Sequence, residues 1–323
     1  MISSLMDALD TDFTIACPAF PETGRTIFKG HLFIADQLLS NTHMADHPLT
    51  PMTDSNLVAV LQRQTSRCVG LVQHREIEEG PDAIRKTFHA LKANGKSIAI
   101  TDAVSDEQLH RIGPALEELK LVTGGSGIAL GLPANYRRAG LIGETSGAEH
   151  VPPIAGPSLV LSGSCSAVTL EQVARFEKSR PSHRLDPLML AVDDGAVQGA
   201  IEWAKDEVSL GPAMIYASAP PDDVKTVQDT LGRTEAGELV ENAMARIAVA
   251  LVQHGVRRLV VAGGETSGAV ATALGIKALR IGTQIDPGVP NTVTIGATEL
   301  ALTLKSGNFG APDFFEKALR AMP

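Results

Sequence analysis

The sequence predicts an α/β protein of two domains, each a mostly parallel sheet flanked by helices. Its 323 residues suffice for two domains with one core each. Short apolar runs rich in β-branched residues alternate with helical stretches, which is typical of a parallel sheet. Residues 140–157, rich in glycine, proline and small polar residues, separate two such arrays and predict a linker. The expected domains are therefore residues 1–150 and 151–323.

The composition narrows the class of protein. With 44% hydrophobic and 20% charged residues the chain is expected to be globular. Its formal charge of −9 argues against binding to nucleic acid or to a membrane surface. No apolar run is long enough to span a bilayer and no signal peptide is evident, so we expect a cytoplasmic protein.

The cysteines and histidines predict neither a disulfide framework nor a metal site. Cys17, Cys68 and Cys165 are far apart and odd in number, which favours a reducing compartment. In the loop over residues 41–54, the spacing of His43, His47 and Asp54 matches no common metal-ligand pattern. We therefore expect no metal held by protein ligands alone.

In the first domain, a proline near the start and a glycine after the end mark the helix expected over residues 80–93. Further helices are expected at residues 2–9, 57–61, 106–119 and 124–130, and strands at 13–17, 69–72, 97–101 and 121–123. A hairpin is expected over residues 26–34, turning at Lys29-Gly30.

In the second domain, apolar residues at spacings of three and four predict a long helix over residues 239–251. Further helices are expected at 169–176, 193–207, 265–274 and 313–321. Strands are expected at 158–161, 213–217, 259–262, 276–281, 293–295 and 300–304.

One stretch, residues 258–270, organises the functional prediction. An apolar strand runs directly into Gly263 and Gly264, and Glu265 to Ser267 open a helix. This arrangement directs free backbone N–H groups at an anion, so it predicts a phosphate cradle for a nucleotide. An ordinary strand-to-helix crossover without a ligand would have the same pattern.

Two more turns of small residues lie in the same domain, at residues 162–166 and 305–310. If the three preceding strands are neighbours, all three turns converge on one edge of the sheet. Together they would supply backbone donors, hydroxyl groups and Lys305, which suits a polyphosphate with a metal ion. No P-loop, dinucleotide-binding fingerprint or nucleophile elbow is present in the sequence.

Five motifs in order resemble the four-carbon acid sugar kinase family, and the pattern is most similar to its 3-oxo-tetronate kinase branch. The motifs are Ala16-Cys-Pro-Ala-Phe-Pro-Glu-Thr-Gly-Arg25, Leu161-Ser-Gly-Ser-Cys-Ser166, Ala262-Gly-Gly-Glu-Thr-Ser-Gly268, Pro287-Gly-Val-Pro290 and Lys305-Ser-Gly-Asn-Phe-Gly310. The resemblance implies transfer of a phosphoryl group from ATP, with Mg²⁺, to the terminal hydroxyl of a four-carbon sugar acid. It also implies that the first domain binds the acid and the second binds ATP.

The resemblance and the turns together predict the site residues. The ATP site is expected to contain Ser162, Ser164, Gly263, Gly264, Glu265, Thr266, Lys305 and Gly307. Arg25, at the carboxyl edge of a predicted strand, and Ser126, in the turn at residues 124–127, are expected to bind the sugar acid, although Arg25 also fits a solvated surface position. These residues identify no catalytic base.

The sequence departs from the family at its start. Family members begin with further α/β units that hold an Asp-Asp-Phe-Thr-Gly-Ala turn, which this sequence lacks. The first domain is therefore expected to be truncated. Two alternatives stay open: an inactive nucleotide-binding remnant of such a kinase, and a phosphosugar-binding or lyase protein that uses the same turns without ATP. The expected partners are small molecules, and a homo-oligomer is left open.

Overall fold

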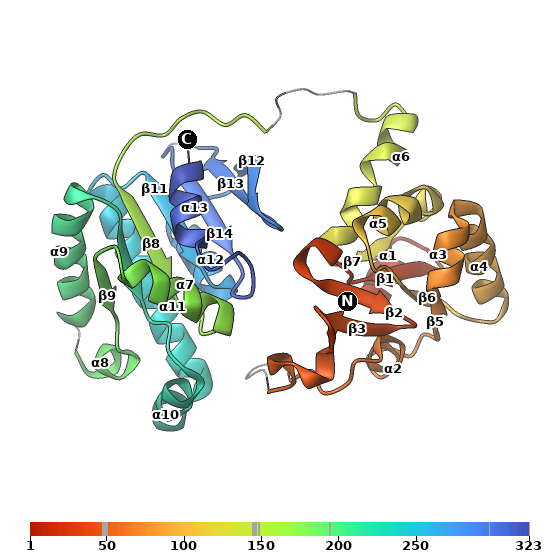
Figure 1. The fold of residues 1–323 in the computed structure, drawn as a ribbon, viewed down its shortest axis with the longest axis horizontal. Coiled ribbons are helices and arrows are strands. Elements are labelled where there is room, and N and C mark those ends of the chain that lie inside the picture. The colour runs from red at the N-terminus through yellow and green to blue at the C-terminus, as the bar shows by residue number, and fades with distance from the viewer. Residues whose placement is uncertain (47–50, 144–146, 148, 194, 297, 323) are drawn as a thin grey trace. The chain divides into compact units, whose positions relative to one another are not determined.

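The computed structural model describes residues 1–46, 51–143, 147, 149–193, 195–296 and 298–322, so His47 lies outside the described residues. The chain forms two compact units, Met1–Thr145 and Ser146–Pro323 (Figure 1). Both are α/β units with parallel sheets flanked by helices, as the sequence predicts. Among the described residues, no helix combines the length and the hydropathy that crossing a bilayer requires.

The first unit is built on a four-stranded parallel sheet in the order β5-β6-β1-β7, with a separate antiparallel sheet β2-β3-β4. Its elements are α1 (Ile2–Ala8), β1 (Thr14–Cys17), η1 (Pro21–Thr23), β2 (Arg25–Phe28), β3 (His31–Ile34), β4 (Gln37–Leu38), η2 (Leu39–Asn41), η3 (His43–Asp46), α2 (Leu57–Gln62), β5 (Val69–Val72), α3 (His74–Glu79), α4 (Pro81–Ala93), β6 (Ile98–Thr101), α5 (Asp106–Ile112), η4 (Gly113–Leu116), β7 (Val122–Gly124), η5 (Ser126–Gly131) and α6 (Pro133–Arg138), where η marks a 3-10 helix.

The central strands of this sheet, β1 and β6, are buried along their whole length, which explains their unbroken apolar sequences. Phe13 packs on Phe88 of α4 with ring centroids 5.3 Å apart. The predicted hairpin is confirmed: β2 and β3 pair antiparallel, and Lys29 and Gly30 have φ angles of 50° and 74°. Two positive φ angles in a two-residue turn match the twist of the flanking strands.

Two helices expected in the first unit differ from the structure. The helix expected over 106–119 stops at Ile112 and continues as the 3-10 helix η4, because Pro114 has no N–H to donate to the helix ladder. The α-helix expected over 124–130 is also wrong, since residues 126–131 form the 3-10 helix η5. The two 3-10 helices touch through glycines: a Cβ added to Gly113 would lie 2.1 Å from the carbonyl oxygen of Gly131.

This contact predicts that Gly113→Ala destabilises the first unit. A methyl group at this position must displace backbone, so we expect a loss of about 2–3 kcal/mol in the free energy of unfolding. Urea unfolding measures the loss. The matched control is Gly143→Ala, since a Cβ at Gly143 would meet no atom within 4 Å. Equal stability of the two variants would contradict the packing described.

The second unit has one seven-stranded sheet in the order β12-β13-β14-β11-β8-β10-β9. Strands β14, β11, β8, β10 and β9 run parallel, and β12 and β13 add an antiparallel hairpin at one edge. Its elements are β8 (Ser158–Ser162), α7 (Ala167–Glu177), β9 (Ser182–Arg184), α8 (Pro187–Val192), α9 (Gly195–Leu210), β10 (Ala213–Tyr216), α10 (Pro221–Leu231), α11 (Arg233–Gln253), β11 (Arg258–Ala262), α12 (Gly264–Ala273), β12 (Leu279–Asp286), β13 (Val289–Thr294), β14 (Ala301–Lys305) and α13 (Phe314–Ala321).

Alternate residues of the central strands fill two separate cores on opposite faces of this sheet. Leu259 and Val261 of β11 pack with residues of α9, α11 and α12, whereas Val260 packs with residues of α7 and α13. Burial on both faces is the reason that the strand sequence is apolar without alternation.

Several boundaries in the second unit differ from those expected. The strands expected at 276–281 and 293–295 form the longer hairpin β12–β13, which turns at Pro287-Gly288. The elements β9, α8 and α10 were not expected, because their segments are short or lack an apolar stripe. The end of the expected linker is packed rather than free, since Ile154 is buried in the core of the second unit.

Candidate nucleotide-binding site

The three turns of small residues lie at one edge of the second sheet. Strand β11 pairs in parallel with β8 on one side and β14 on the other, and Ala262 is in register with both Ser162 and Lys305. The three strands therefore end at the same level. This confirms the condition that the sequence left open, that the three strands are neighbours, and it places the turns at the carboxyl edge, where open α/β sheets bind ligands.

The turn between β11 and α12 leaves backbone donors at the start of a helix. Gly263 has a φ of 126°, a conformation that glycine adopts without strain, and its N–H donates to the Lys305 carbonyl at 2.9 Å. The first helical bond joins the Ser267 N–H to the Gly263 carbonyl, so the N–H groups of residues 264–266 precede the helix ladder. No side chain in the described part of the chain caps α12. The helix dipole and these donors favour an anion at this point.

The turn between β8 and α7 packs directly on the first turn of α12. The N–H groups of Gly163 and Ser164 both donate to the Ala262 carbonyl, at 3.0 and 3.2 Å. A Cβ on Gly163 would lie 2.2 Å from Oγ1 of Thr266, so only glycine fits between these turns. Thr266 is buried, as is Ser267, whose Oγ has no hydrogen-bond partner within the described residues.

The third turn begins with a buried lysine. Lys305 is 1% exposed, and its Nζ donates to Oγ1 of Thr169 at 2.9 Å and to the carbonyls of Ser306 and Gly307 at 3.2 and 3.1 Å. All three ammonium protons thus have an acceptor inside the protein. Burial lowers the pKa of Lys305 to about 7. An amine that gains and loses its proton near neutral pH therefore lies directly under the turn at residues 305–310.

The structure brings most of the predicted ATP-site residues together. A Cβ on Gly307 would lie 2.4 Å from Oγ of Ser164, which joins the third turn to the first. The side chain of Ser162 is fully buried, and its Oγ lies 2.8 Å from Oγ of Ser218. This hydrogen bond stabilises the carboxyl edge of the sheet from inside the protein. Gly264 and Glu265 are exposed at the start of α12.

Sequence reasoning missed four residues of this edge: Gly163, Ser166, Thr169 and Ser218. Ser166 caps α7, with Oγ accepting from the Thr169 N–H at 3.2 Å, and a serine directly before a helical segment is a signal for such a cap. Ser218 follows β10 in a run of small residues, but only the sheet order places it beside Ser162.

The two residues predicted to bind the sugar acid border one segment of the first unit, Pro18–Phe20. Arg25 begins β2 and exchanges backbone hydrogen bonds with Phe20, and burial lowers the pKa of its half-buried guanidinium. Ser126 is exposed between two glycines that pack on this segment: a Cβ on Gly127 would lie 2.3 Å from the Ala19 carbonyl oxygen. Both residues lie at the carboxyl edge of the first sheet.

A buried carboxylate organises that edge. Asp102 follows β6 and accepts hydrogen bonds from the N–H groups of Lys29, Gly30 and His74, at 2.7, 2.8 and 3.0 Å. These hydrogen bonds hold the β2–β3 turn and the first residue of α3 at the carboxyl end of the sheet. In the sequence, Asp102 directly follows the strand expected at residues 97–101, and nothing local indicates its role, since its partners are distant in the chain.

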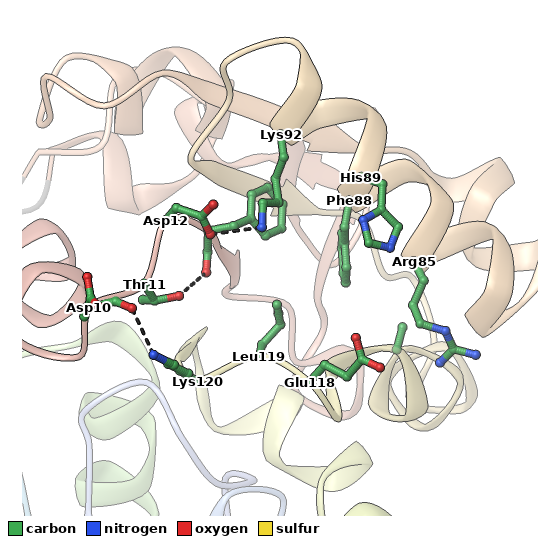
Figure 2. Close-up of a pocket in the computed structure, with 12 residues that line it drawn as sticks. Asp10, Thr11, Asp12, Arg85, Phe88, His89, Lys92, Glu118, Leu119 and Lys120 are labelled. Carbon is green, nitrogen blue, oxygen red and sulfur yellow. Dashed lines mark hydrogen bonds and ion pairs between the residues drawn. The ribbon is translucent and has the colours of Figure 1, made fainter.

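A pocket of about 460 Å³ in the first unit lies elsewhere, next to residues that precede β1 and β7 (Figure 2). Its lysines are already engaged: Lys92 pairs with Asp12 at 3.0 Å, and Lys120 donates to the Asp10 carbonyl at 3.0 Å (Figure 2). The pocket is at the amino edge of the sheet, opposite the edge that holds Asp102, so we do not assign the substrate to it.

Comparison with known proteins gives two domain models and close relatives. Residues 1–132 match the sugar-binding N-terminal domain model and residues 159–315 match the nucleotide-binding C-terminal domain model. The chain is 55% identical over 320 residues to a 3-oxo-tetronate kinase of Cupriavidus necator, an alignment that covers 99% of this chain and 74% of the relative. The chain belongs to the four-carbon acid sugar kinase family. It is a phosphotransferase with an alcohol group as acceptor.

Solved structures of related proteins agree with this family membership. A Salmonella typhimurium protein, 36% identical, has a TM-score of 0.80, with 100% of this chain and 76% of that chain covered. A Haemophilus influenzae protein of the family DUF1537, 38% identical, has a TM-score of 0.69, with 100% and 77% covered. The three turns of the candidate site fall inside the part of this kinase chain that matches the nucleotide-binding domain model.

Proposed function

We propose that this kinase phosphorylates the terminal hydroxyl of 3-oxo-tetronate with ATP, giving 3-oxo-tetronate 4-phosphate. The substrate comes from the name of the relatives, and the ATP site comes from the geometry of the second unit. The observation that carries the proposal is the convergence of three turns on the open N-terminus of α12. The domain roles follow: residues 1–150 would bind the sugar acid and residues 151–323 the nucleotide.

Phosphoryl transfer requires the protein mainly to align the acceptor and to neutralise charge on the transferred group. In the proposed site, the N–H groups of Gly264, Glu265 and Thr266 bind phosphate oxygens, and Lys305 lies buried under the neighbouring turn at residues 305–310. Ser164 and Gly307, in the two neighbouring turns, contact each other and border the proposed site. On the first unit, the Arg25 guanidinium would orient the acid carboxylate and Ser126 would donate to it.

The residues near α12 fit a Mg²⁺ ion that accompanies the phosphates. When bound, the ion supplies charge neutralisation on the phosphate oxygens. Among the described residues no three His, Cys, Asp or Glu side chains form a metal-binding group. Mg²⁺, however, needs only one or two carboxylates beside phosphate and water. Glu265 is exposed at this helix start, and its negative charge contributes, after burial, to raising the pKa of Glu241 on α11. Glu265 is therefore the residue of this chain that would hold the ion, directly or through a water molecule.

We place the protein in a reducing cytoplasm, since Cys17, Cys68 and Cys165 are all free thiols in the structure.

The function is tested by calorimetry with Mg-ATP followed by a coupled ADP-release assay with 3-oxo-tetronates. We expect binding of Mg-ATP and ADP release that depends on the acid. Binding without turnover would instead support the inactive nucleotide-binding remnant. If a sugar phosphate raises the melting temperature and Mg-ATP does not, the phosphosugar-binding alternative replaces the proposal.

A further inference from the structure

The amine of Lys305 is buried among neutral groups. The side chain is 1% exposed, and its Nζ lies 5.9 Å from the ring centroid of Phe314 on α13. Its three hydrogen-bond acceptors, the Thr169 hydroxyl and the carbonyls of Ser306 and Gly307, carry no formal charge. A buried amine without an acid beside it releases its proton more readily than an amine in water.

The charged groups on the elements around Lys305 do not determine its protonation. Lys317 of α13 pairs with Asp286 and Asp313, at 3.0 and 3.3 Å. Burial is the only cause that lowers the pKa of Lys305 to about 7. The other titratable or charged side chains on the β8–α7 turn, α7 and α13 are Cys165, Glu171, Arg175, Glu177, Glu316 and Arg320.

The hydrogen bonds around Nζ suit both protonation states. A protonated amine donates to all three acceptors, and the Thr169 hydroxyl donates to the Gly307 carbonyl at 2.8 Å. In the neutral amine a lone pair replaces one proton. The Thr169 hydroxyl can rotate and donate to that lone pair, since Oγ1 lies 2.9 Å from Nζ. The amine therefore has hydrogen-bond partners in either state.

The proposed phosphate position lies one strand away from this amine. Strand β14 pairs with β11, Lys305 is in register with Ala262, and the Lys305 carbonyl accepts from the Gly263 N–H at 2.9 Å. Adjacent strands are about 4.8 Å apart, so a phosphate at the start of α12 would lie on the order of 10 Å from Nζ. Buried charges are screened weakly, so the negative charge of the nucleotide would favour the protonated amine.

We propose that nucleotide binding is coupled to proton uptake: when Mg-ATP binds, the buried amine of Lys305 takes one proton from solution and is positively charged in the complex. The inference rests on the proposed function. The attraction acts through space and requires no contact between Nζ and the nucleotide. The sign of the pH dependence follows. Affinity is highest below pH 7, where the free protein already holds the proton, and it falls as the pH rises above 7.

Calorimetry of Mg-ATP binding in buffers of different ionisation enthalpy counts the protons, and excess Mg²⁺ keeps the nucleotide itself deprotonated. For the wild type we expect uptake of about 0.5 proton at pH 7 and about 0.9 at pH 8, with about fivefold lower affinity at pH 8. Lys305→Met should take up less than about 0.1 proton at either pH. Lys178→Met, at an exposed position at the C-terminus of α7, is the matched control and should take up as many protons as the wild type.

A wild-type complex that forms without proton uptake at pH 8, or equal uptake by the wild type and Lys305→Met, would overturn the inference and leave the proposed function in place. A wild type that does not bind Mg-ATP would overturn the proposed function and this inference with it.

A second measurement does not require the variant to bind nucleotide. NMR resonances of the lysine ε-methylene groups report the protonation of Lys305 in the wild type, and Lys305→Met assigns its resonance. This resonance should titrate near pH 7 in the free protein and keep its protonated position at pH 8 with Mg-ATP. A position at pH 8 that is the same with and without Mg-ATP would contradict the proposal.

Discussion

Replacing Gly264 by valine should abolish nucleotide binding while leaving the fold in place. Gly264 is the first residue of α12, it is exposed, and a Cβ there would meet no protein atom within 4 Å. A branched side chain therefore fits the protein but fills the space in front of the N–H groups. We expect calorimetry to show Mg-ATP affinity reduced on the order of 100-fold, with a melting temperature near that of the wild type.

Gly268→Val provides the matched control for this experiment. Gly268 lies on the same helix, is also exposed and also has open space around its Cβ position. The control therefore carries the same cost of valine in a helix, one turn away from the donors. It should bind Mg-ATP as the wild type does. Normal binding by Gly264→Val would show that the phosphates are elsewhere.

Replacing Lys305 by methionine should lower kinase activity strongly without loss of stability at neutral pH. Methionine fills a similar volume, and Ser166 and Thr169 still donate to the Gly307 carbonyl. The variant loses the positive charge that Lys305 carries when it is protonated, so we expect kcat/KM to fall on the order of 100-fold in a coupled assay run below pH 7. It also loses the desolvation penalty of that charge, so its free energy of unfolding should equal or exceed the wild-type value.

The same substitution should change how stability depends on pH. Burial lowers the pKa of Lys305 to about 7 from the ordinary value of 10.5. Below pH 7 both the folded and the unfolded chain bind the proton, and the penalty is fully present. Between pH 7 and 10.5 only the unfolded lysine stays protonated, so wild-type stability rises with pH by at most about 1.4 kcal/mol per pH unit.

Urea unfolding at several pH values up to about pH 9.5 tests this dependence. The upper limit avoids Tyr216, whose pKa is raised by burial to about 12 and whose contribution to stability has the opposite sign above pH 10. As the pH rises, the free energy of unfolding of the wild type should increase relative to that of Lys305→Met. A difference that stays constant over this range would mean that the lysine is not desolvated as described.

The parts of the fold that depend on local pattern could be predicted from the sequence. The apolar strand at residues 259–262, the double glycine and the helix after it specify the β11–α12 unit through neighbouring residues alone. The Lys29-Gly30 turn is similar, because positive φ angles favour such residues. Pro114 is a local signal that the helix expected over residues 106–119 ends early, since proline cannot donate to the helix ladder.

The parts that depend on contacts between distant residues could not be predicted. Thr169 reads as an ordinary helix residue until the sheet order places α7 against the loop after β14. Nothing local shows that Lys305 is buried or that Asp102 binds the turn of a distant hairpin. The three turns can be recognised in the sequence. Their convergence on one edge follows only from the order of the strands in the sheet.

The most direct test of the account is a crystal structure of the protein with Mg²⁺ and a non-hydrolysable ATP analogue. The account predicts phosphate oxygens within hydrogen-bond distance of the N–H groups of Gly264, Glu265 and Thr266, with Ser164 and Gly307 beside them. Phosphates bound at another edge of the second sheet, or a nucleotide that leaves these three N–H groups to water, would contradict it.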